Sequence, residues 1–209
     1  MTNSKKENIE VELRGPLSKE KFLELENFFK NNGNFKSNKE RVLIDYSTFL
    51  PEEGIEKRQK DIRLRVTNGV PEIVVKLGNW GGDENREEIS VLAKEGNFDN
   101  LVKIFGILGL QKGMLCVRKS KVYDYQEIEF ALVEVPDHSF YFEAEKVISR
   151  EDDIENTRKE IREVCHGLGL DIFDEEGFFK YINTLNKEAN EVFEFDNHHD
   201  TYFKDRFNL

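Results

Sequence analysis

The stretch IRLRVTNGVPEIVVKL, residues 62–77, contains two runs in which apolar side chains recur at every second position. A period of two is typical of a β-strand that has one apolar and one polar face. Asn68-Gly69 separates the two runs, and this dipeptide between alternating segments is a strong hairpin signal. The stretch therefore predicts an antiparallel hairpin with an apolar face and a face that carries basic residues.

The same alternation recurs on both sides of this hairpin, in residues 9–14, 86–91, 127–132 and 140–145. We expect each segment to form a strand with one apolar face. Residues 78–85 are rich in glycine and polar residues, which indicates a longer hairpin loop. Residues 120–134 contain no strong turn signal, which favours one long strand there.

Four other segments have apolar residues at helical spacing, and they cover residues 18–33, 97–108, 152–168 and 174–185. An amphipathic helix must bury its apolar face, so we expect these helices to pack on the apolar faces of the strands. From Asn186 onward the sequence is irregular. We therefore predict one domain over residues 1–185 and a C-terminal extension over residues 186–209, whose aromatic side chains could hold it on the surface.

Composition narrows the function. The chain has 209 residues and a net charge of −11, so we expect one domain and no nucleic-acid partner, because phosphate contacts need a basic face. No apolar run is long enough to cross a bilayer or to resemble a signal peptide, so we expect no membrane partner and a cytoplasmic location. Cys116 and Cys165 fit no metal motif and are expected to be reduced thiols.

The polar faces of the predicted strands carry pairs of like charge rather than neutral residues. These pairs are Glu10 with Glu12, Arg63 with Arg65, Lys119 with Lys121, Glu127 with Glu129, and Glu143 with Glu145. Like charges repel unless opposite charges lie across from them. Helices that cover the apolar faces would leave these charges inside. The fold we predict is α+β: a closed antiparallel β-barrel with a charged lumen and helices packed on the outside.

A lumen of this kind suits a particular ligand. Arginine and lysine side chains bind phosphate oxygens, and the guanidinium group does so with two parallel hydrogen bonds. Carboxylates repel phosphate but hold hard divalent cations, which in turn bind phosphate oxygens. Acidic and basic pairs in one cavity therefore indicate a site for a metal ion and a phosphate chain. Ladders of structural salt bridges are the simpler alternative when the alternation is considered alone.

Eight short elements with charged or aromatic residues follow one another along the chain: Glu10-Val11-Glu12-Leu13-Arg14, Asp45-Tyr46, Ile62-Arg63-Leu64-Arg65, Val74-Val75-Lys76, Arg86-Glu87-Glu88, Arg118-Lys119-Ser120-Lys121, Phe142-Glu143-Ala144-Glu145 and Phe178-Phe179-Lys180-Tyr181-Ile182. In the same order, they resemble the signature strands and final helix of the CYTH family of triphosphate tunnel metalloenzymes, which includes class IV adenylate cyclases and thiamine triphosphatases. Each is weak alone, but their order and spacing span most of the chain.

The resemblance implies a role for each matching position. Metal-binding roles fall on Glu10, Glu12, Glu143 and Glu145. Phosphate-binding roles fall on Arg63, Arg65, Lys76, Arg86, Lys119 and Lys121. Catalytic roles fall on Arg14, Glu88 and Glu129, and the implied cofactor is Mg²⁺ or Mn²⁺.

Some positions depart from the family pattern. Arg14 stands where the family usually has lysine, and arginine keeps the charge but is bulkier. The acid that precedes the closing E-x-E is Glu129 by strand parity or Glu134 by distance along the chain, and we favour Glu129. Tyr123 and Tyr125 share the parity of Lys119 and Lys121, so they could line the tunnel or stack on an organic group near one end.

The function that these features favour is hydrolysis of a triphosphate, with inorganic tripolyphosphate as the first candidate substrate, because no motif recognises a base or a thiazole. The alternatives are a class IV adenylate cyclase, a thiamine triphosphatase and a non-catalytic binder of polyphosphate or nucleotides. The expected partner is thus a small molecule that contains a triphosphate, and the resemblance also suggests a homodimer.

Overall fold

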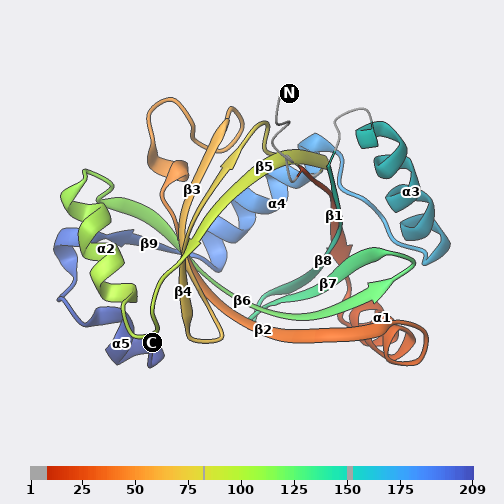
Figure 1. Ribbon diagram of the computed structural model, residues 1–209, viewed down its shortest axis with the longest axis horizontal. Helices are drawn as coiled ribbons and strands as arrows, with labels where there is room; N and C mark the ends of the chain where they lie inside the picture. Colours follow the sequence, from red (N-terminus) through yellow and green to blue (C-terminus); the bar gives the residue numbers. More distant parts are fainter. Residues whose placement is uncertain (1–8, 82, 150–152) are drawn as a thin grey trace, which may run out of the picture.

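The computed structural model describes residues 9–81, 83–149 and 153–209, and this part of the chain forms a β-barrel with helices around it (Figure 1). The strands are β1 (Ile9–Leu17), β2 (Asn34–Asp45), β3 (Lys60–Thr67), β4 (Val70–Leu77), β5 (Asp83–Leu92), β6 (Lys112–Tyr125), β7 (Ile128–Val135), β8 (Ser139–Ile148) and β9 (Glu191–Glu194). The helices are α1 (Lys19–Asn32), α2 (Phe98–Ile107), α3 (Ile154–Gly167), α4 (Glu175–Glu188) and α5 (Tyr202–Phe207), with short 3₁₀ turns at Ser47–Phe49 and Phe195–Asn197.

All strand pairs are antiparallel, and the strand order is β2-β3-β4-β5-β1-β8-β7-β6-β9. An additional pairing between β2 and β6 closes the first eight strands of this order into a barrel. β7 pairs with the second half of β6, and β9 pairs with the beginning of β6 on the same side. The predicted closed barrel with outer helices is confirmed.

The predicted hairpin at residues 62–77 is confirmed as β3 and β4. Asn68 and Gly69 have φ angles of 51° and 85°, and a two-residue loop with two positive φ angles matches the twist of the strands that it joins. The expectation of one long strand over residues 120–134 is wrong, because a second such loop divides it. Gln126 and Glu127 adopt positive φ angles without the glycine or asparagine that would signal a turn in the sequence.

The helices are close to their predicted positions and lie outside the barrel. α1 begins after Ser18, whose hydroxyl accepts a hydrogen bond from the Lys21 backbone N–H. Its Phe29 is fully buried against Tyr123 of β6 and Phe130 of β7. α1 and α3 thus cover the outer faces of β1, β6 and β8 and form one apolar core.

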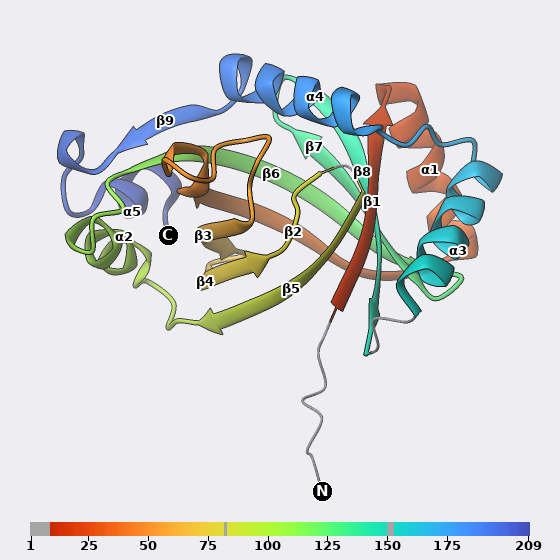
Figure 2. The same ribbon diagram turned by 90° about the horizontal axis from the view of Figure 1, so that it is seen from above.

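A second apolar core lies at the other end of the molecule, where α2, α5 and β9 meet the outer faces of β2 and β3 (Figure 1). Phe193 of β9 and Phe203 of α5 are buried in it. The residues predicted to form a C-terminal extension therefore pack against the barrel. α4 continues to Glu188, past the expected boundary at residue 185, and lies along one side of the barrel (Figure 2).

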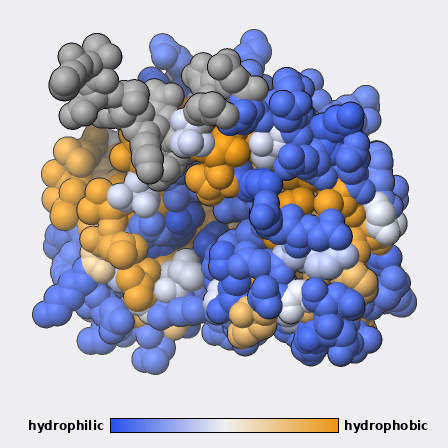
Figure 3. Space-filling view, turned by 45° about the vertical axis from the view of Figure 1, so that its right-hand side comes forward, coloured by the Kyte–Doolittle hydropathy of each residue, from blue (hydrophilic) through white to orange (hydrophobic). Residues whose placement is uncertain are grey.

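Some of the outer barrel surface remains exposed, including Ile89 and Val91 of β5. Figure 3 shows separate hydrophobic patches between hydrophilic areas on the face that it draws. None of the helices in the described residues is long and apolar enough to cross a membrane.

We predict that Phe29→Ala lowers the free energy of unfolding by about 3–5 kcal/mol, because it leaves a cavity between α1 and the barrel. Leu23→Ala on the same helix is the matched control, since Leu23 is 53% exposed, and should change stability by less than about 0.5 kcal/mol. Urea unfolding followed by circular dichroism measures both variants. Equal losses in the two variants would contradict the packing described for this face of α1.

Candidate active site

Charged side chains from seven strands of the barrel line one cavity of about 120 Å³ in its lumen. The lining residues are Glu10, Glu12, Arg14, Lys39, Arg41, Arg63, Arg65, Lys76, Glu88, Ser120, Glu129, Ala131, Glu143 and Glu145. Ten of the thirteen residues predicted to have a site role are therefore neighbours in the structure. The strand register brings them together, because each contributes from the inward face of its strand.

Carboxylates crowd one side of this cavity. Glu12 on β1 lies directly opposite Glu145 on β8, and Glu10 follows on the same face of β1. Burial, followed by the charges of Glu12 and Glu10, raises the pKa of Glu145 to about 8. Burial also raises the pKa of Glu10, although Lys76 opposes this. Glu10 and Glu12 have cationic partners in Lys76 and Arg14, whereas Glu145 forms no ion pair with the described residues.

The donor chemistry of this group fits Mg²⁺ or Mn²⁺, which prefer carboxylate oxygens. As the side chains stand, lysine and arginine side chains hold several of these oxygens. Within the described residues, no group of three or more His, Cys, Asp or Glu side chains is arranged to hold a metal ion. Binding would therefore require some carboxylates to exchange a cationic partner for the metal ion.

Lys76 is the central cation among these carboxylates. Its Nζ lies 2.5 Å from Glu10 and 3.0 Å from Glu88. Arg65 donates to Glu88 at 3.2 Å and to Glu72 at 2.6 Å. Burial pushes the pKa of Glu88 upward, but Lys76 and then Arg65 more than offset this, so the pKa of Glu88 is lowered. Glu88 is thus a carboxylate that stays ionised within the tunnel.

Glu129 lies at another part of the same cavity. Its two carboxylate oxygens pair with Lys36 at 2.6 Å and with Lys39 at 3.4 Å. Glu134, the alternative candidate for the tunnel acid, lies on the opposite face of β7 across from Lys119 of β6. Glu129 and not Glu134 therefore lines the cavity, and the catalytic role of Glu129 stays a prediction.

Arg14 lies at the boundary of two cavities and lines both. Its Nη2 donates to Glu12 at 2.8 Å, and its Nε lies 3.4 Å from Glu143. Its Nη1 donates to the Gly81 carbonyl at 3.3 Å. The guanidinium therefore links the two acidic strands β1 and β8 through separate nitrogen atoms. The single ammonium group of a lysine could not reach both strands in this geometry.

A buried ion-pair network around Asp61 holds Arg63 in place. Asp61 is fully buried, and its oxygens accept from Arg63 Nε at 2.8 Å, from Arg86 Nη1 at 2.9 Å and from Arg58 Nη1 at 3.2 Å. Burial raises the pKa of Asp61, but these three arginines more than offset it and hold the pKa well below its usual range. Arg58 also stacks on Trp80, with its guanidinium carbon 4.0 Å from the ring centre.

Arg86 therefore takes a different position from the one expected. It shares the inward face of β5 with Glu88 and lies across from Glu10 of β1, but its side chain is buried beside Asp61 and lines neither of the two cavities. The sequence analysis did not identify Arg58 or Asp61 as supporting residues. The sequence offers only an arginine and an aspartate three residues apart around the start of β3, and it does not show that they are buried.

The expectation that Lys119 and Lys121 line the tunnel is wrong. Both point outward, and Lys121 forms an ion pair with Glu26 of α1 at 2.6 Å, with its Nζ 5.9 Å from the Phe22 ring. Tyr123 has the same parity and is buried against α1. The inward positions of β6 are those of Arg118 and Ser120.

The reason for this error is that β6 begins with apolar residues on both faces. Met114 and Cys116 contact Leu43 inside the barrel, while Leu115 belongs to the outer core. The alternation therefore carries no information about which face is inward. The sequence analysis also missed Lys39 and Arg41, because the first half of β2 is polar on both faces.

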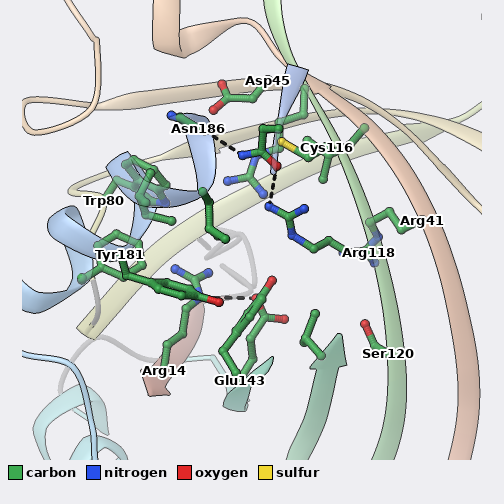
Figure 4. A pocket seen from close by; sticks show the side chains of 18 of the residues that line it. Arg14, Arg41, Asp45, Trp80, Cys116, Arg118, Ser120, Glu143, Tyr181 and Asn186 are labelled. Carbon is green, nitrogen blue, oxygen red and sulfur yellow. Dashed lines mark hydrogen bonds and ion pairs between the residues drawn. The ribbon is translucent and has the colours of Figure 1, made fainter. Parts of the chain in front are cut away.

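A second cavity of about 110 Å³ adjoins the first, and Arg14, Arg41, Arg63, Ser120 and Glu143 line both. Figure 4 shows Arg41, Arg118 and Ser120 along one wall, with Trp80 and Tyr181 on the other side of the space. α4 closes this side with Tyr181, Ile182 and Leu185. The tunnel is thus charged at one end and partly aromatic at the other.

Comparisons with known proteins give a consistent picture of the fold. No protein-family model matches the sequence, and no curated protein matches it at a significant level. A solved structure from Pyrococcus horikoshii OT3 superposes with a TM-score of 0.70 at 20% identity, over 86% of this chain and 99% of that one.

Two further solved structures carry descriptions. One from Vibrio parahaemolyticus, described as a "putative adenylate cyclase", has a TM-score of 0.62 at 16% identity and covers 85% of this chain and 99% of that one. One from Hippeastrum, described as a "putative adenylyl cyclase" with a dominant triphosphatase activity, has a TM-score of 0.53 at 12% identity over 86% and 95% of the two chains. The chain has the triphosphate-tunnel fold of CYTH-like proteins, as the sequence resemblance implied.

We predict that stability of the metal-free protein falls as the pH rises from about 4.5 towards 8, through Glu145. The usual pKa of this group is 4.5 and its folded value is about 8, so in this window the folded state holds a proton that the unfolded state has lost. Glu145→Gln removes this contribution. The free energy of unfolding of the wild type minus that of the variant should therefore decrease with pH and level off above 8.

Urea unfolding in buffer with a chelator, at several pH values, measures this difference. Glu127→Gln is the control for loss of a carboxylate outside the cavity, because Glu127 is exposed at the β6–β7 turn. A flat profile for Glu145→Gln would show that the carboxylates are not crowded as described.

Proposed function

We propose that the protein hydrolyses a triphosphate in its tunnel with the help of a divalent metal ion, and that inorganic tripolyphosphate is the substrate. One observation carries this proposal: Glu145 stands in a crowd of carboxylates without an ion pair among the described residues, and the adjoining cavity holds two arginines in the same situation. Arg41 and Arg118 form no ion pair with a carboxylate of the described residues. A complex of a metal ion with a phosphate chain supplies both missing charges.

The binding step follows from the charges of the tunnel. Arg63, Arg65 and Lys76 are inward-facing cations that would bind phosphate oxygens, with Arg14 at the terminal phosphoryl group. Glu10, Glu12, Glu143 and Glu145 would hold Mg²⁺ or Mn²⁺. When bound, the metal ion would neutralise phosphate charge and polarise the bridging oxygen. Arg63 is held by Asp61 and would need little rearrangement to meet the substrate, which favours catalysis.

The chemical step needs no covalent intermediate. Water attacks phosphorus in line with the bridging oxygen, the bond from phosphorus to that oxygen breaks, and pyrophosphate and orthophosphate leave. Glu88 or Glu129 would orient the water and accept its proton. Glu88 suits this role because its pKa is lowered, so it is ionised near neutral pH.

Adenylate cyclase activity is the alternative that a specific observation favours. The second cavity has an aromatic wall that includes Trp80, Phe178 and Tyr181, which could hold a base. The structure from Vibrio parahaemolyticus is also described as a "putative adenylate cyclase". In this reaction the ribose hydroxyl replaces water as the nucleophile, and ATP gives cyclic AMP and pyrophosphate.

We predict that the purified protein releases orthophosphate from tripolyphosphate in the presence of Mg²⁺ or Mn²⁺, and that Glu10→Gln lowers kcat/KM by roughly 100-fold or more. Glu134→Gln is the matched control, because Glu134 faces away from the tunnel, and should retain nearly full activity. Phosphate release from tripolyphosphate, ATP and thiamine triphosphate is measured with and without a chelator.

The ATP reaction is also analysed for cyclic AMP. Cyclic AMP without orthophosphate would replace the hydrolase proposal with the cyclase. Tight binding of tripolyphosphate without turnover of any substrate would leave a non-catalytic binder. Equal activity of Glu10→Gln and Glu134→Gln would rule out chemistry at this end of the tunnel.

A further inference from the structure

We propose that Arg41 and Arg118 form an oxyanion subsite on the α4 side of the tunnel, and that Asn190 positions Arg118 there without neutralising it. The ligand is a compact oxyanion: the phosphoryl group of the substrate chain that lies furthest from the carboxylates. This inference rests on the proposed function, which it extends from the reacting group to the far end of the chain.

The strand register makes the arginine pair unusual. Arg41 on β2 and Arg118 on β6 are direct cross-strand partners, and both side chains line the second cavity. Like charges directly opposite each other in a sheet are destabilising. Burial, followed by the neighbouring Arg65, lowers the pKa of Arg41, so its surroundings disfavour the charge in the absence of an anion. An anion between the two guanidinium groups would remove this repulsion.

The partners of the two arginines are neutral, which sets them apart from the other tunnel cations. Arg41 Nε donates to the Thr67 hydroxyl at 3.1 Å. Arg118 donates to the Val117 carbonyl at 2.7 Å and to the Asn190 side-chain oxygen at 2.9 Å. In contrast, Lys76 and Arg65 each lie against two carboxylates.

Asn190 is itself held in place. Its side-chain amide donates to the side-chain oxygen of Asn186, in the last turn of α4, at 2.7 Å. The next residues form β9, which pairs with the start of β6 just before Arg118. An amide at position 190 therefore fixes the direction of the guanidinium and leaves its full positive charge available. An aspartate there would form an ion pair and remove that charge from the ligand.

The same cavity offers further hydrogen-bond donors, beside the carboxylates of Asp45 and Glu143 and an apolar wall on the α4 side. Ser120 and Tyr141 add hydroxyl groups to the same cavity as Arg41 and Arg118. Arg14 and Arg63 line both cavities, so a chain of phosphates can extend from the carboxylates to this subsite along a continuous row of cations. A substrate with an anionic group at each end fits this arrangement better than one with a neutral group at the far end.

The experiment uses orthophosphate and pyrophosphate as probes, bound to the full chain in metal-free buffer and measured by calorimetry. Asn190→Asp should weaken binding by about tenfold or more, and Asn190→Ala should weaken it less, because only the carboxylate neutralises Arg118. Arg118→Gln should match or exceed the loss in Asn190→Asp. Asn183→Asp is the matched control, since Asn183 is exposed on α4 away from this cavity, and should bind like the wild type.

Steady-state kinetics give the second readout. Asn190→Asp should raise the KM for tripolyphosphate about tenfold with kcat within about threefold, and raise the KM for ATP less. Thermal unfolding midpoints identify any variant that has lost its fold. If Arg118→Gln has lost it, the comparison of Asn190→Asp with Asn190→Ala decides, because both variants keep the arginine.

The two proposals fail in different ways. If Asn190→Asp binds both probes as tightly as Asn183→Asp does, the subsite is overturned even when tripolyphosphate is hydrolysed. If Asn190→Ala loses as much affinity as Asn190→Asp, the residue acts through structure rather than charge, and the proposal is also overturned. If the predicted order of affinities holds but no triphosphate is hydrolysed, the subsite stands and the proposed function fails.

Discussion

Like charges that face each other across neighbouring strands are the constraint on which this structure depends. Glu12 lies opposite Glu145, and Arg41 lies opposite Arg118. Each pair costs stability in a lumen that is screened less than an open surface. The barrel tolerates the cost because two large apolar cores on its outside hold the register, so the side chains inside cannot separate by a slip of the strands. The apolar cores outside the barrel thus stabilise the fold, and this stability offsets the repulsion between like charges inside it.

The buried network around Asp61 shows how part of that charge is fixed. Asp61 accepts from three arginines, while Trp80 covers Arg58. Breaking one member of such a network leaves the others unpaired in a medium where unpaired charges are costly. The guanidinium of Arg63 is therefore oriented before any ligand arrives. The side of the lumen that carries Arg63 is therefore preorganised. On the carboxylate side, in contrast, some side chains must exchange a lysine or arginine partner for the metal ion.

Much of this organisation could be predicted from the sequence, and the parts that could not have physical reasons. The alternation of β1 and β8 put the carboxylates on the polar faces of these strands, and the order of the CYTH-like elements then favoured a site in the lumen over ladders of salt bridges. The parity of β6 was read wrongly, since its first residues are apolar on both faces. The neutral partner of Arg118 lies 72 residues further along the chain, and no local pattern links the two positions. The period of a strand predicts which of its side chains share a face, whereas the contacts of each side chain depend on how the whole barrel closes.

The way in which β1 is held also has a consequence for folding kinetics. Ile9 pairs with Ile148 on one side and with Glu87 on the other, so β1 has no neighbour close to it in sequence. The loops that these pairings close are long, and the contact order of the barrel is correspondingly high. Hairpins such as β3–β4 can form early, but the barrel closes only when its most distant strands meet. Until then the apolar faces of β1 and β8 are exposed to solvent, so a slow-folding intermediate of this chain would be prone to aggregate.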